Sequence, residues 1–329
     1  MAGFLTSREV HINKPLTNIS IAYIQNANDF IATKVFPQVA SLKQSDIYFN
    51  FDRQYWMRTG AQLRAPATES AGGGFHIDAN NSYFCRKYSF HMDLAEELLV
   101  NADDPLDISK SATEFVTRNL LLRREKSFIS RYMAPNVWKG FGQTNSSGVY
   151  TTSDFTPATL WSDDKSNPIA DIAQLKTGIK RNTGMTPNTL VVSYDVNERL
   201  KQHPMILSRI IYSQKGQLTE DLIAEFFGVE RYLVAGVVET QTTLGQTPSY
   251  NFMMNNCALL VYAAPSPSLA VPSGGYVFSW SGLLGGGADG TRIKTLPMPH
   301  LEAQRVEGDM AYDMKLVAPD VGVLAVNLL

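Results

Sequence analysis

The stretch 187–241 constrains the fold most, because short strand-like runs alternate in it with short helical segments. Residues 190–192 form an apolar run rich in β-branched side chains, and residues 195–202 can form a helix that has to end before Pro204. A second strand is expected over 233–238. We therefore predict one compact unit here that mixes helices and strands.

The best-marked helix of this stretch is Glu220–Phe227. Thr219 stands where a side-chain oxygen can cap the first turn, and Gly228 stands where the chain has to leave the helix. Three apolar residues of this helix are expected to pack on the strand 233–238: Leu222, Phe226 and Phe227. Outside the stretch, a helix is expected over 169–181, strands tucked into a sheet over 256–264 and 321–328, and short strands from Tyr276 onward.

Two strands of alternating polarity flank a long connection. Over 47–55 the odd positions form the drier face, and over 83–94 the apolar side chains occupy even positions from 84 to 94. These two strands should pair with each other. The connection 59–82 contains the three consecutive glycines 72–74 and is too long and too rich in turn residues for an ordinary hairpin. Long hairpins of this kind tend to be functional.

The longest expected helix covers 107–133, about 40 Å at a rise of about 1.5 Å per residue. Pro105 and a capping box of Ser111 and Glu114 indicate its start, and Pro135 ends it. Its expected apolar stripe consists of Ile108, Ala112, Phe115, Leu122, Ile129 and Met133.

Charged residues form two groups around this helix. The basic residues on the helix are Arg118, Arg123, Arg124 and Arg131. The acidic residues at and before its start are Asp93, Glu96, Glu97, Asp103, Asp104 and Asp107. Two interpretations stay open: a solvated basic face of an amphipathic helix, or a basic helix of one subunit that meets the acidic segment of another.

Composition excludes several classes of protein. With 329 residues, 44% of them hydrophobic, the chain can bury a sizeable core. No run approaches the ~18 apolar residues of a membrane span, and the first ten residues lack the basic and apolar regions of a signal peptide. A formal net charge of −2 provides no cationic field for strong binding to nucleic acid. We therefore expect a globular protein that is made and used in a cytoplasm, away from membranes.

Signals of catalysis are few. The five histidines are scattered, and no HExxH, GxSxG or GxxxxGK[ST] motif occurs. The glycine-rich stretch 285–290 lacks the lysine and the following helix of a phosphate-binding loop, so a surface turn is expected there. Cys85 and Cys257 are expected to be buried free thiols, with a disulfide as the alternative. We assign no catalytic, metal-binding or cofactor-binding residue.

The order of these pieces resembles the major capsid proteins of tailed bacteriophages. The stretch 187–241, with its strand, helix, His-Pro turn, helix and strand, is similar to the axial domain of that family, which surrounds the symmetry axes. Other similar segments are VFPQV at 35–39, YFNFDRQYW at 48–56, RAPATES at 64–70, GYVFSW at Gly275–Trp280 and the ending RVEGDMAYDMKLVAPDVGVLAVNL at 305–328. The resemblance covers nearly the whole chain and rests on the order of many weak motifs.

The resemblance implies an α+β fold of the Hong Kong 97 type. The implied parts are an N-terminal arm over 1–45, an extended β-hairpin loop over 46–95, the long spine helix with part of the peripheral domain over 96–167, an axial domain over 168–272 and closing strands of the peripheral sheet over 273–329. The implied function is that of a major capsid protein. Such a protein self-assembles into hexamers and pentamers of an icosahedral shell, which encloses double-stranded DNA without sequence-specific binding. The shell is the capsid of the virion and is assembled in the cytoplasm of the bacterial host.

Further implications concern partners and contacts. The chain would bind itself, with scaffolding, portal and decoration proteins as further partners. Some capsid families link subunits through a lysine–asparagine bond, but the loop 59–82 has no lysine and Lys87 lies back on the strand, so this bond is not expected. The residues expected at contacts between subunits are Arg64, Glu69, Asp103, Asp104, Asp107, Arg118, Arg123, Arg124 and Arg131. Two other functions stay open: a different ring-forming phage protein of the tail or the decoration, and a hydrolase that forms small oligomers.

Overall fold

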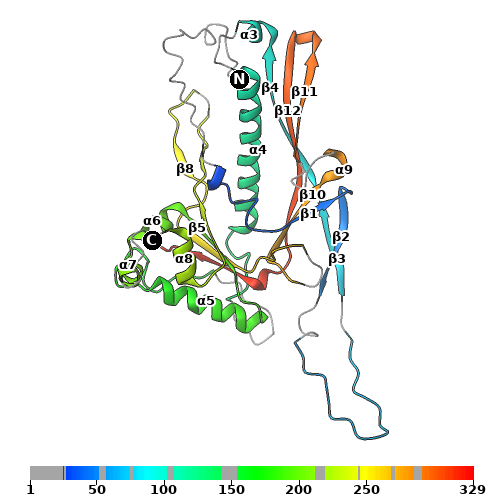
Figure 1. Cartoon of the computed structure of the whole chain (residues 1–329), viewed down its shortest axis with the longest axis vertical. Coiled ribbons are helices and arrows are strands. Elements are labelled where there is room, and N and C mark those ends of the chain that lie inside the picture. The colour runs from blue at the N-terminus through cyan, green and yellow to red at the C-terminus, as the bar shows by residue number, and fades with distance from the viewer. Residues whose placement is uncertain are drawn as a thin grey trace.

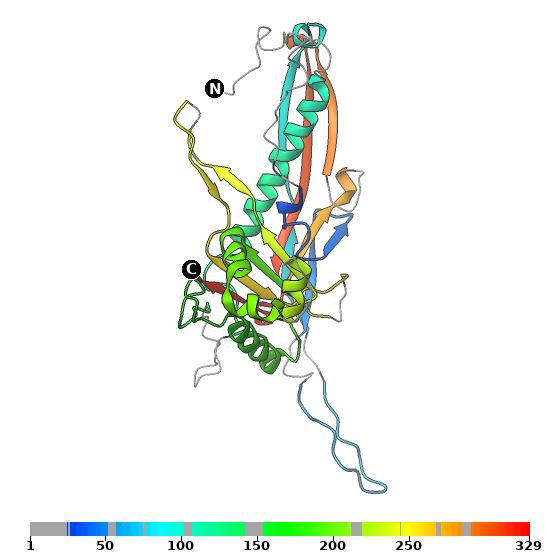
Figure 2. The same cartoon turned by 60° about the vertical axis from the view of Figure 1, so that its left-hand side comes forward.

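The computed structural model describes residues 25, 27–51, 57–74, 77–101, 107–141, 154–211, 219–243, 245–267, 271–284 and 291–329. The subunit is elongated: a long helix and long strands stand upright, a lobe of short helices lies beside their lower end, and a narrow hairpin extends beyond both (Figure 1). The hairpin also stands apart from the rest of the subunit when the molecule is turned by 60° (Figure 2). Two main sheets make up most of the described chain. One large hydrophobic core joins the larger sheet and α4 to one face of the smaller sheet, and a second core lies on the other face of the smaller sheet.

The larger sheet is centred on the long strand β12 (Ala303–Leu316). On one side β12 pairs with β4 (Arg86–Ala95) in antiparallel orientation. On its other side, the first part of β12 pairs with β11 (Thr291–Met298) and the last part with β10 (Gly275–Trp280). Strand β1 (Gln38–Ser41) runs parallel to β10 at the edge. The strand predicted over Gly275–Trp280 is therefore confirmed.

Helix α4 (Ile108–Tyr132) packs along this sheet and confirms the predicted long helix. It begins after Asp107, whose side chain accepts a hydrogen bond from the backbone N–H of Lys110 at 2.9 Å. The expected capping box of Ser111 and Glu114 therefore lies inside the helix and does not start it. Buried residues recur every four positions along α4: Ile108, Ala112, Val116, Leu120, Arg124, Phe128 and Tyr132, with Glu125 beside them.

The apolar stripe expected for α4 is right at its two ends, where Ile108 and Ala112 are buried and Ile129 and Met133 pack against the core. In the middle it is wrong, because Phe115 is 51% exposed and Leu122 is only partly buried.

The face that packs on the sheet is set by close approach to β12, where a Cβ at Gly308 would lie 2.6 Å from Cγ1 of Val116. Because this face also includes Arg124 and Glu125, counting apolar side chains misplaced the middle of the stripe.

The smaller sheet has the strand order β13–β9–β5–β6. Strand β5 (Thr189–Ser193) is completely buried and lies between the parallel β6 (Arg231–Ala235) and the antiparallel β9 (Cys257–Val261). Strand β13 (Gly322–Val326) pairs with β9. The C-terminal strand thus lies in the smaller sheet, whereas the expected boundary 273–329 grouped it with the closing strands of the larger one.

Four helices surround the smaller sheet: α5 (Pro168–Thr183), α6 (Tyr194–Gln202), α7 (Pro204–Ile211) and α8 (Glu220–Phe227) (Figure 1). Three of them agree with the predicted helices, and α7 was not predicted. In α8, Thr219 Oγ1 accepts a hydrogen bond from the N–H of Leu222 at 3.4 Å, and Gly228 adopts a left-handed conformation with φ of 59°, as expected. Phe227 is buried as predicted, but Phe226 is only partly buried and Ile223 is buried in its stead.

The projecting hairpin is formed by β2 (Ser45–Phe51) and β3 (Ile77–Phe84), which pair in antiparallel orientation. The expected pairing of 47–55 with 83–94 is wrong for most of the second strand. At Cys85, whose N–H donates to the carbonyl of Gln44 at 2.8 Å, the chain leaves β3 and continues as β4, which pairs with β12 instead.

The alternation of polarity predicted for these strands holds in β4 and fails in β2. In β4 the even-numbered apolar residues from 88 to 94 pack on the core under α4. In β2, Ile47 and Phe49 are 56% and 51% exposed, whereas the ring of Tyr48 stacks on that of Phe278 at 5.6 Å. The odd positions 47 and 49 therefore do not form a dry face, and the hairpin is joined to the larger sheet through Tyr48 instead.

The remaining elements are short: η2 (Ala27–Asp29), α3 (Glu96–Val100), β7 (Val238–Thr240), β8 (Tyr250–Phe252), α9 (Ser281–Leu284), η3 (Pro299–Leu301) and η4 (Pro319–Val321). None of the helices in the described ranges is long and apolar enough to cross a membrane. Both cysteines are free: Cys85 is buried and Cys257 partly buried. The expected surface turn at 285–290 lies outside the described residues.

Candidate functional site

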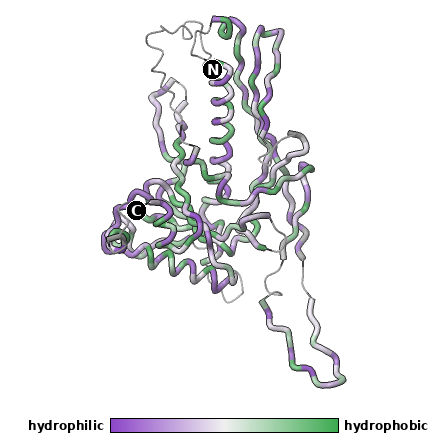
Figure 3. The backbone as a smooth tube through the Cα atoms, in the orientation of Figure 1, coloured by the Kyte–Doolittle hydropathy of each residue, from purple (hydrophilic) through white to green (hydrophobic). Residues whose placement is uncertain are grey.

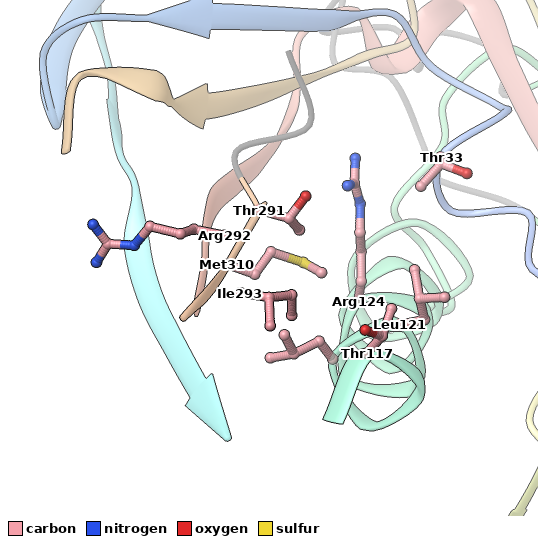
Figure 4. Close-up of a pocket in the computed structure, with 9 residues that line it drawn as sticks. Thr33, Thr117, Leu121, Arg124, Thr291, Arg292, Ile293 and Met310 are labelled. Carbon is pink, nitrogen blue, oxygen red and sulfur yellow. The ribbon is translucent and has the colours of Figure 1, made fainter. Parts of the chain in front are cut away.

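The described part of the chain offers little to a metal or a small ligand. Its His, Cys, Asp and Glu residues nowhere gather in a group of three or more that could hold a metal ion. A mostly apolar cavity of about 180 Å³ lies between α4 and β11, bordered by Leu121, Ile293 and Met310 (Figure 4). Pockets for drug-sized ligands usually measure ~300–1,000 Å³. The surfaces on which another protein can pack are therefore the better candidates.

The first such surface is the loop 57–74 at the end of the hairpin. Every residue of this loop is exposed, and Leu63 is 103% exposed. A Cβ added at Gly60 or at any of the glycines 72–74 would meet no atom within 4 Å. The few hydrogen bonds inside it are local, such as Thr68 Oγ1 to the carbonyl of Ala65 at 2.8 Å and Arg64 Nε to the carbonyl of Thr68.

Beyond its base at Met57, the loop has little support from the described residues of its own subunit. Ordering the backbone of one residue costs ~1–2 kcal/mol, and burial of apolar surface is the main term that offsets this cost. Apolar and polar residues follow each other irregularly along the loop, so neither side of it is entirely polar (Figure 3). Met57, at the base of the loop, lies close to its own subunit, where a Cβ at Gly184 would be 3.3 Å from its Cε. Leu63 is fully exposed, so another molecule has to supply any burial of its side chain.

The second candidate surface was the basic face of α4, and the structure uses much of it inside the subunit. Arg118 Nη1 donates to the carbonyl of Gln25 at 2.6 Å. The side chain of Gln25 in turn accepts from the N–H of Val238 at 3.0 Å and donates to its carbonyl at 2.7 Å. Lys126 forms an ion pair with Glu239 at 2.8 Å. The middle of α4 is thus tied to the N-terminal segment and to strand β7.

Two further arginines of α4 also bind within the subunit. The guanidinium of Arg123 lies 4.9 Å from the centre of the Tyr88 ring, a cation–π arrangement. Arg124 is 2% exposed, with its guanidinium 5.7 Å from the Tyr312 ring and Nη2 donating to Gln38 Oε1 at 3.4 Å. Arg124 is therefore wrong as a contact to a neighbouring subunit, because its own core encloses it.

The other expected contact residues have varied surroundings. Arg64 and Glu69 lie on the exposed loop 57–74, and Arg131 is exposed in the last turn of α4. Asp107 is exposed but serves its own helix as the cap. Asp103 and Asp104 lie outside the described residues. The expected contact between an acidic segment and the basic face of α4 stays a prediction, but Arg124 is no longer part of that face.

An ionic cluster that the sequence did not reveal lies on the face of the larger sheet opposite α4. At its centre, the fully buried carboxylate of Asp309 accepts from Ser89 Oγ at 2.7 Å. It also binds Lys87 at 3.0 Å, Arg292 at 2.9 Å and Lys294 at 3.4 Å. The strand register could have indicated it, since Asp309 lies opposite Ser89 on β4 and Arg292 on β11. That register is not visible in the sequence.

The cluster holds its carboxylates in the ionised form. Burial alone would raise the pKa of Asp309, but the hydrogen bonds from Arg292, Ser89 and Lys87 hold that pKa well below its usual range. Further along the sheet, Arg305 binds Asp93 through two hydrogen bonds of 2.7 and 2.8 Å, which lower the pKa of Asp93. These ion pairs join β4, β12 and β11 on the face of the sheet opposite α4. Without them, only the apolar layer on the α4 side would hold these strands together.

Comparison with known proteins agrees with this architecture. No family model matches the chain. A phage-related protein of Bordetella bronchiseptica has a similar structure, with a TM-score of 0.67 and 17% identity over 93% of this chain and 94% of that one. The mature capsid of bacteriophage PhiM1 gives a TM-score of 0.57 at 12% identity over 94% and 89% of the two chains.

The fold is therefore the α+β capsid fold of the Hong Kong 97 type, as the order of the sequence motifs predicted. In sequence, the chain is 27% identical over 234 residues to the major capsid protein of Burkholderia phage BcepMu, covering 69% of each chain. The predicted resemblance to the major capsid proteins of tailed phages is thereby confirmed.

Proposed function

We propose that the chain is the major capsid protein of a tailed bacteriophage. It self-assembles into hexamers and pentamers, and these form an icosahedral shell around double-stranded DNA. The relative in Burkholderia phage BcepMu supports this function, as does the fold shared with the PhiM1 capsid along 94% of the chain.

The observation that carries the proposal is the loop 57–74. Every residue of this segment is exposed, including apolar side chains such as Leu63, and these gain buried surface only if a neighbouring copy covers them. A specific interface buries about 1,600 Å² in total. Because a subunit in a shell joins several neighbours at once, modest individual contacts are enough to hold it in place.

The charge of the chain suits an enclosing wall. A net charge of −2 leaves no general attraction for DNA phosphates, so the wall confines the DNA without binding its sequence. Much of the positive charge on the larger sheet is compensated internally, as in the cluster around Asp309. A strongly cationic inner wall would oppose the packing and the release of the genome.

We assign the parts of the subunit the roles that the sequence suggested. The N-terminal arm would comprise 1–45, of which the structure describes 25 and 27–45, and the loop 57–74 within 46–95 would reach a neighbour. The spine within 96–167 would be α4, and the helices beside the smaller sheet support an axial domain over 168–272. The closing region 273–329 contributes β10, β11 and β12 to the peripheral sheet and β13 to the axial one. Scaffolding, portal and decoration proteins are further partners, and assembly takes place in the cytoplasm of the host.

The shell function also explains why the described residues offer few groups suited to catalysis. The proposal treats the chain as a structural protein and assigns it no catalytic residue. A hydrolase that forms small oligomers would need a constellation of acid, base or nucleophile in a pocket. The cavity beside α4 has no histidine, cysteine, aspartate or glutamate among the residues that line it. A tail or decoration protein shares the ability to form rings but not a closed shell.

Electron microscopy of the purified full-length chain tests the proposal. We expect shells, capsomers with five- and six-fold symmetry, or sheets of capsomers. Rings of one symmetry that stack into tubes would favour a tail protein. Uniform particles of two to four subunits under all conditions of salt and concentration would contradict the capsid function.

A further inference from the structure

Glu125 is the only acidic residue of α4 that is buried in the described chain. The N-terminal segment 27–38 crosses α4 near this residue, and both cartoon views place η2 beside the helix (Figures 1 and 2). The segment is part of the core: Phe30, Ile31, Ala32, Val35 and Phe36 are all buried. Its position on α4 therefore affects the packing of the whole larger sheet.

Glu125 holds this segment by its backbone. The side chain is 1% exposed, and its Oε2 accepts hydrogen bonds from the N–H of Ala32 at 2.9 Å and of Ile31 at 3.2 Å. The carbonyl of Ile31 in turn accepts from the N–H groups of Lys34 and Val35, which closes a helical turn. Glu125 thus supplies the acceptor for the free N–H groups at the start of that turn.

Two charged groups act on Glu125 directly, and a third binds the crossing segment beside it. Arg124 is its neighbour on α4, and Lys34 lies on the crossing segment. From the smaller sheet, Arg231 of β6 donates to the carbonyls of Lys34 at 2.8 Å and of Val35 at 3.2 Å. From the larger sheet, the ring of Tyr312 on β12 faces Arg124.

These neighbours do not fully compensate the burial of the carboxylate. Burial raises the pKa of Glu125 to about 7, against the opposing effects of the Ala32 and Ile31 amides, Arg124 and Lys34. Its second oxygen, Oε1, is buried and has no hydrogen-bond partner among the described residues. The buried side chain is therefore placed between two elements with one of its oxygens unsatisfied.

We propose that Glu125 is a protonation-controlled switch that sets how tightly the segment 27–38 is held on α4. The neutral side chain is buried without cost from charge, and the segment is held firmly. When the side chain is ionised, the uncompensated charge favours opening of the segment, which exposes Glu125 to water. The switch acts within one subunit, so it does not depend on the proposed capsid function.

The sign of the effect follows from the two protonation states. The pKa of Glu125 is higher in the closed state than the ordinary glutamate value of about 4.3, which the open state has. The stability of the closed segment is therefore complete at acidic pH and is lost as pH rises through about 7. Alkaline conditions loosen the root of the N-terminal arm, and mildly acidic conditions fix it.

Hydrogen exchange of the full-length protein tests this switch at constant assembly state from pH 6 to pH 8. After correction for the intrinsic exchange rate, we expect the protection of the Ile31 and Ala32 amides to fall about tenfold over this range. In E125Q, whose side chain still offers an acceptor oxygen, we expect protection independent of pH. The matched control E114Q changes an exposed glutamate of the same helix and should follow the wild type.

Two outcomes would overturn the proposal. One is an E125Q protein in which the protection of Ile31 and Ala32 falls with pH as steeply as in the wild type. The other needs no variant, which matters if E125Q folds poorly: the wild-type protection of Ile31 and Ala32 stays constant relative to that of Val191 and Val192. Those two reference amides lie in β5, in the buried centre of the smaller sheet.

Discussion

The helical lobe around the smaller sheet and the hairpin loop 57–74 differ in what holds them. The lobe has its own core, in which β5 is buried throughout and helices such as α8 are capped at both ends by their own sequence. Among the described residues, the loop has only local hydrogen bonds, and none of its side chains is buried. One region is stable because of its own residues, whereas the other depends on a neighbouring copy if the proposed function holds.

The larger sheet with α4 lies between these extremes. Its inner face packs on the helix, as a core should, but its outer face is joined by an ionic cluster around Asp309. A shell subunit thus contains some residues that stabilise its fold and others that form contacts with neighbouring subunits. Variants in the lobe, in the ionic cluster and on α4 test this division.

The largest expected effect on folding comes from truncating the core of the lobe. Phe227→Ala should lower the free energy of unfolding by about 3–5 kcal/mol. Phe227 is only 4% exposed, so removing its ring leaves a cavity in the core. Denaturant unfolding of the isolated subunit measures it. The neighbouring Phe226→Ala should cost clearly less, because Phe226 is only partly buried. Equal losses in the two variants would mean that α8 is rotated relative to the structure.

The ionic cluster should give the next largest effect. Asp309→Asn should lower the free energy of unfolding at pH 7 by about 2–3 kcal/mol, less than the ~3–5 kcal/mol for a completely buried pair. The reduction reflects the partial exposure of Lys87 and Arg292, each 35%. Glu307→Gln, at the edge of the cluster, serves as the milder control.

The same cluster predicts a pH dependence. Because the pKa of Asp309 is held below its ordinary value of about 3.9, its contribution is present above that pH and is lost as pH falls through the lower, folded-state pKa. The difference in unfolding free energy between wild type and Asp309→Asn should therefore be constant from pH 5 to 7 and shrink below about pH 4. A difference that grows on acidification would contradict the assignment.

The smallest effect is expected on the exposed side of α4. Arg123→Ala removes the cation–π contact with Tyr88 and should cost about 0.5–1 kcal/mol. Arg131→Ala, at an exposed site, should change the unfolding free energy by less than about 0.5 kcal/mol. If Arg131 contacts an acidic neighbour, its loss should instead weaken assembly, and light scattering across a salt series would detect this. Assembly that is insensitive to both Arg131→Ala and salt would favour the solvated basic face.

The sequence predicted the fold where local signals define the elements. Helix α8 has a capping threonine and a closing glycine, and the segment GYVFSW, which resembles a closing strand of the capsid family, forms β10. It failed where distant residues decide. The pairing of β4 with β12 joins strands more than 200 residues apart, so the alternation in β4 favoured the nearer but wrong partner β2.

The candidate sites show the same limit. Arg124 was expected at the surface because arginine usually lies there, but the N-terminal segment and β12 enclose it. Glu125 and Asp309 were missed because their partners come from other strands and segments. The loop 57–74 was recognised, since length and glycine content are local properties of the sequence.

Sedimentation velocity of a loop deletion tests the central claim most directly. Deleting residues 60–73 leaves β2 and β3 intact with a short connection, so the subunit should keep its fold and its melting temperature. We predict that wild-type protein sediments as shells or capsomers, whereas the deletion variant remains a folded subunit or small oligomer and forms no closed shells. Normal shells built from the deletion variant would contradict the claim that this loop is ordered by, and needed for, contact with a neighbour.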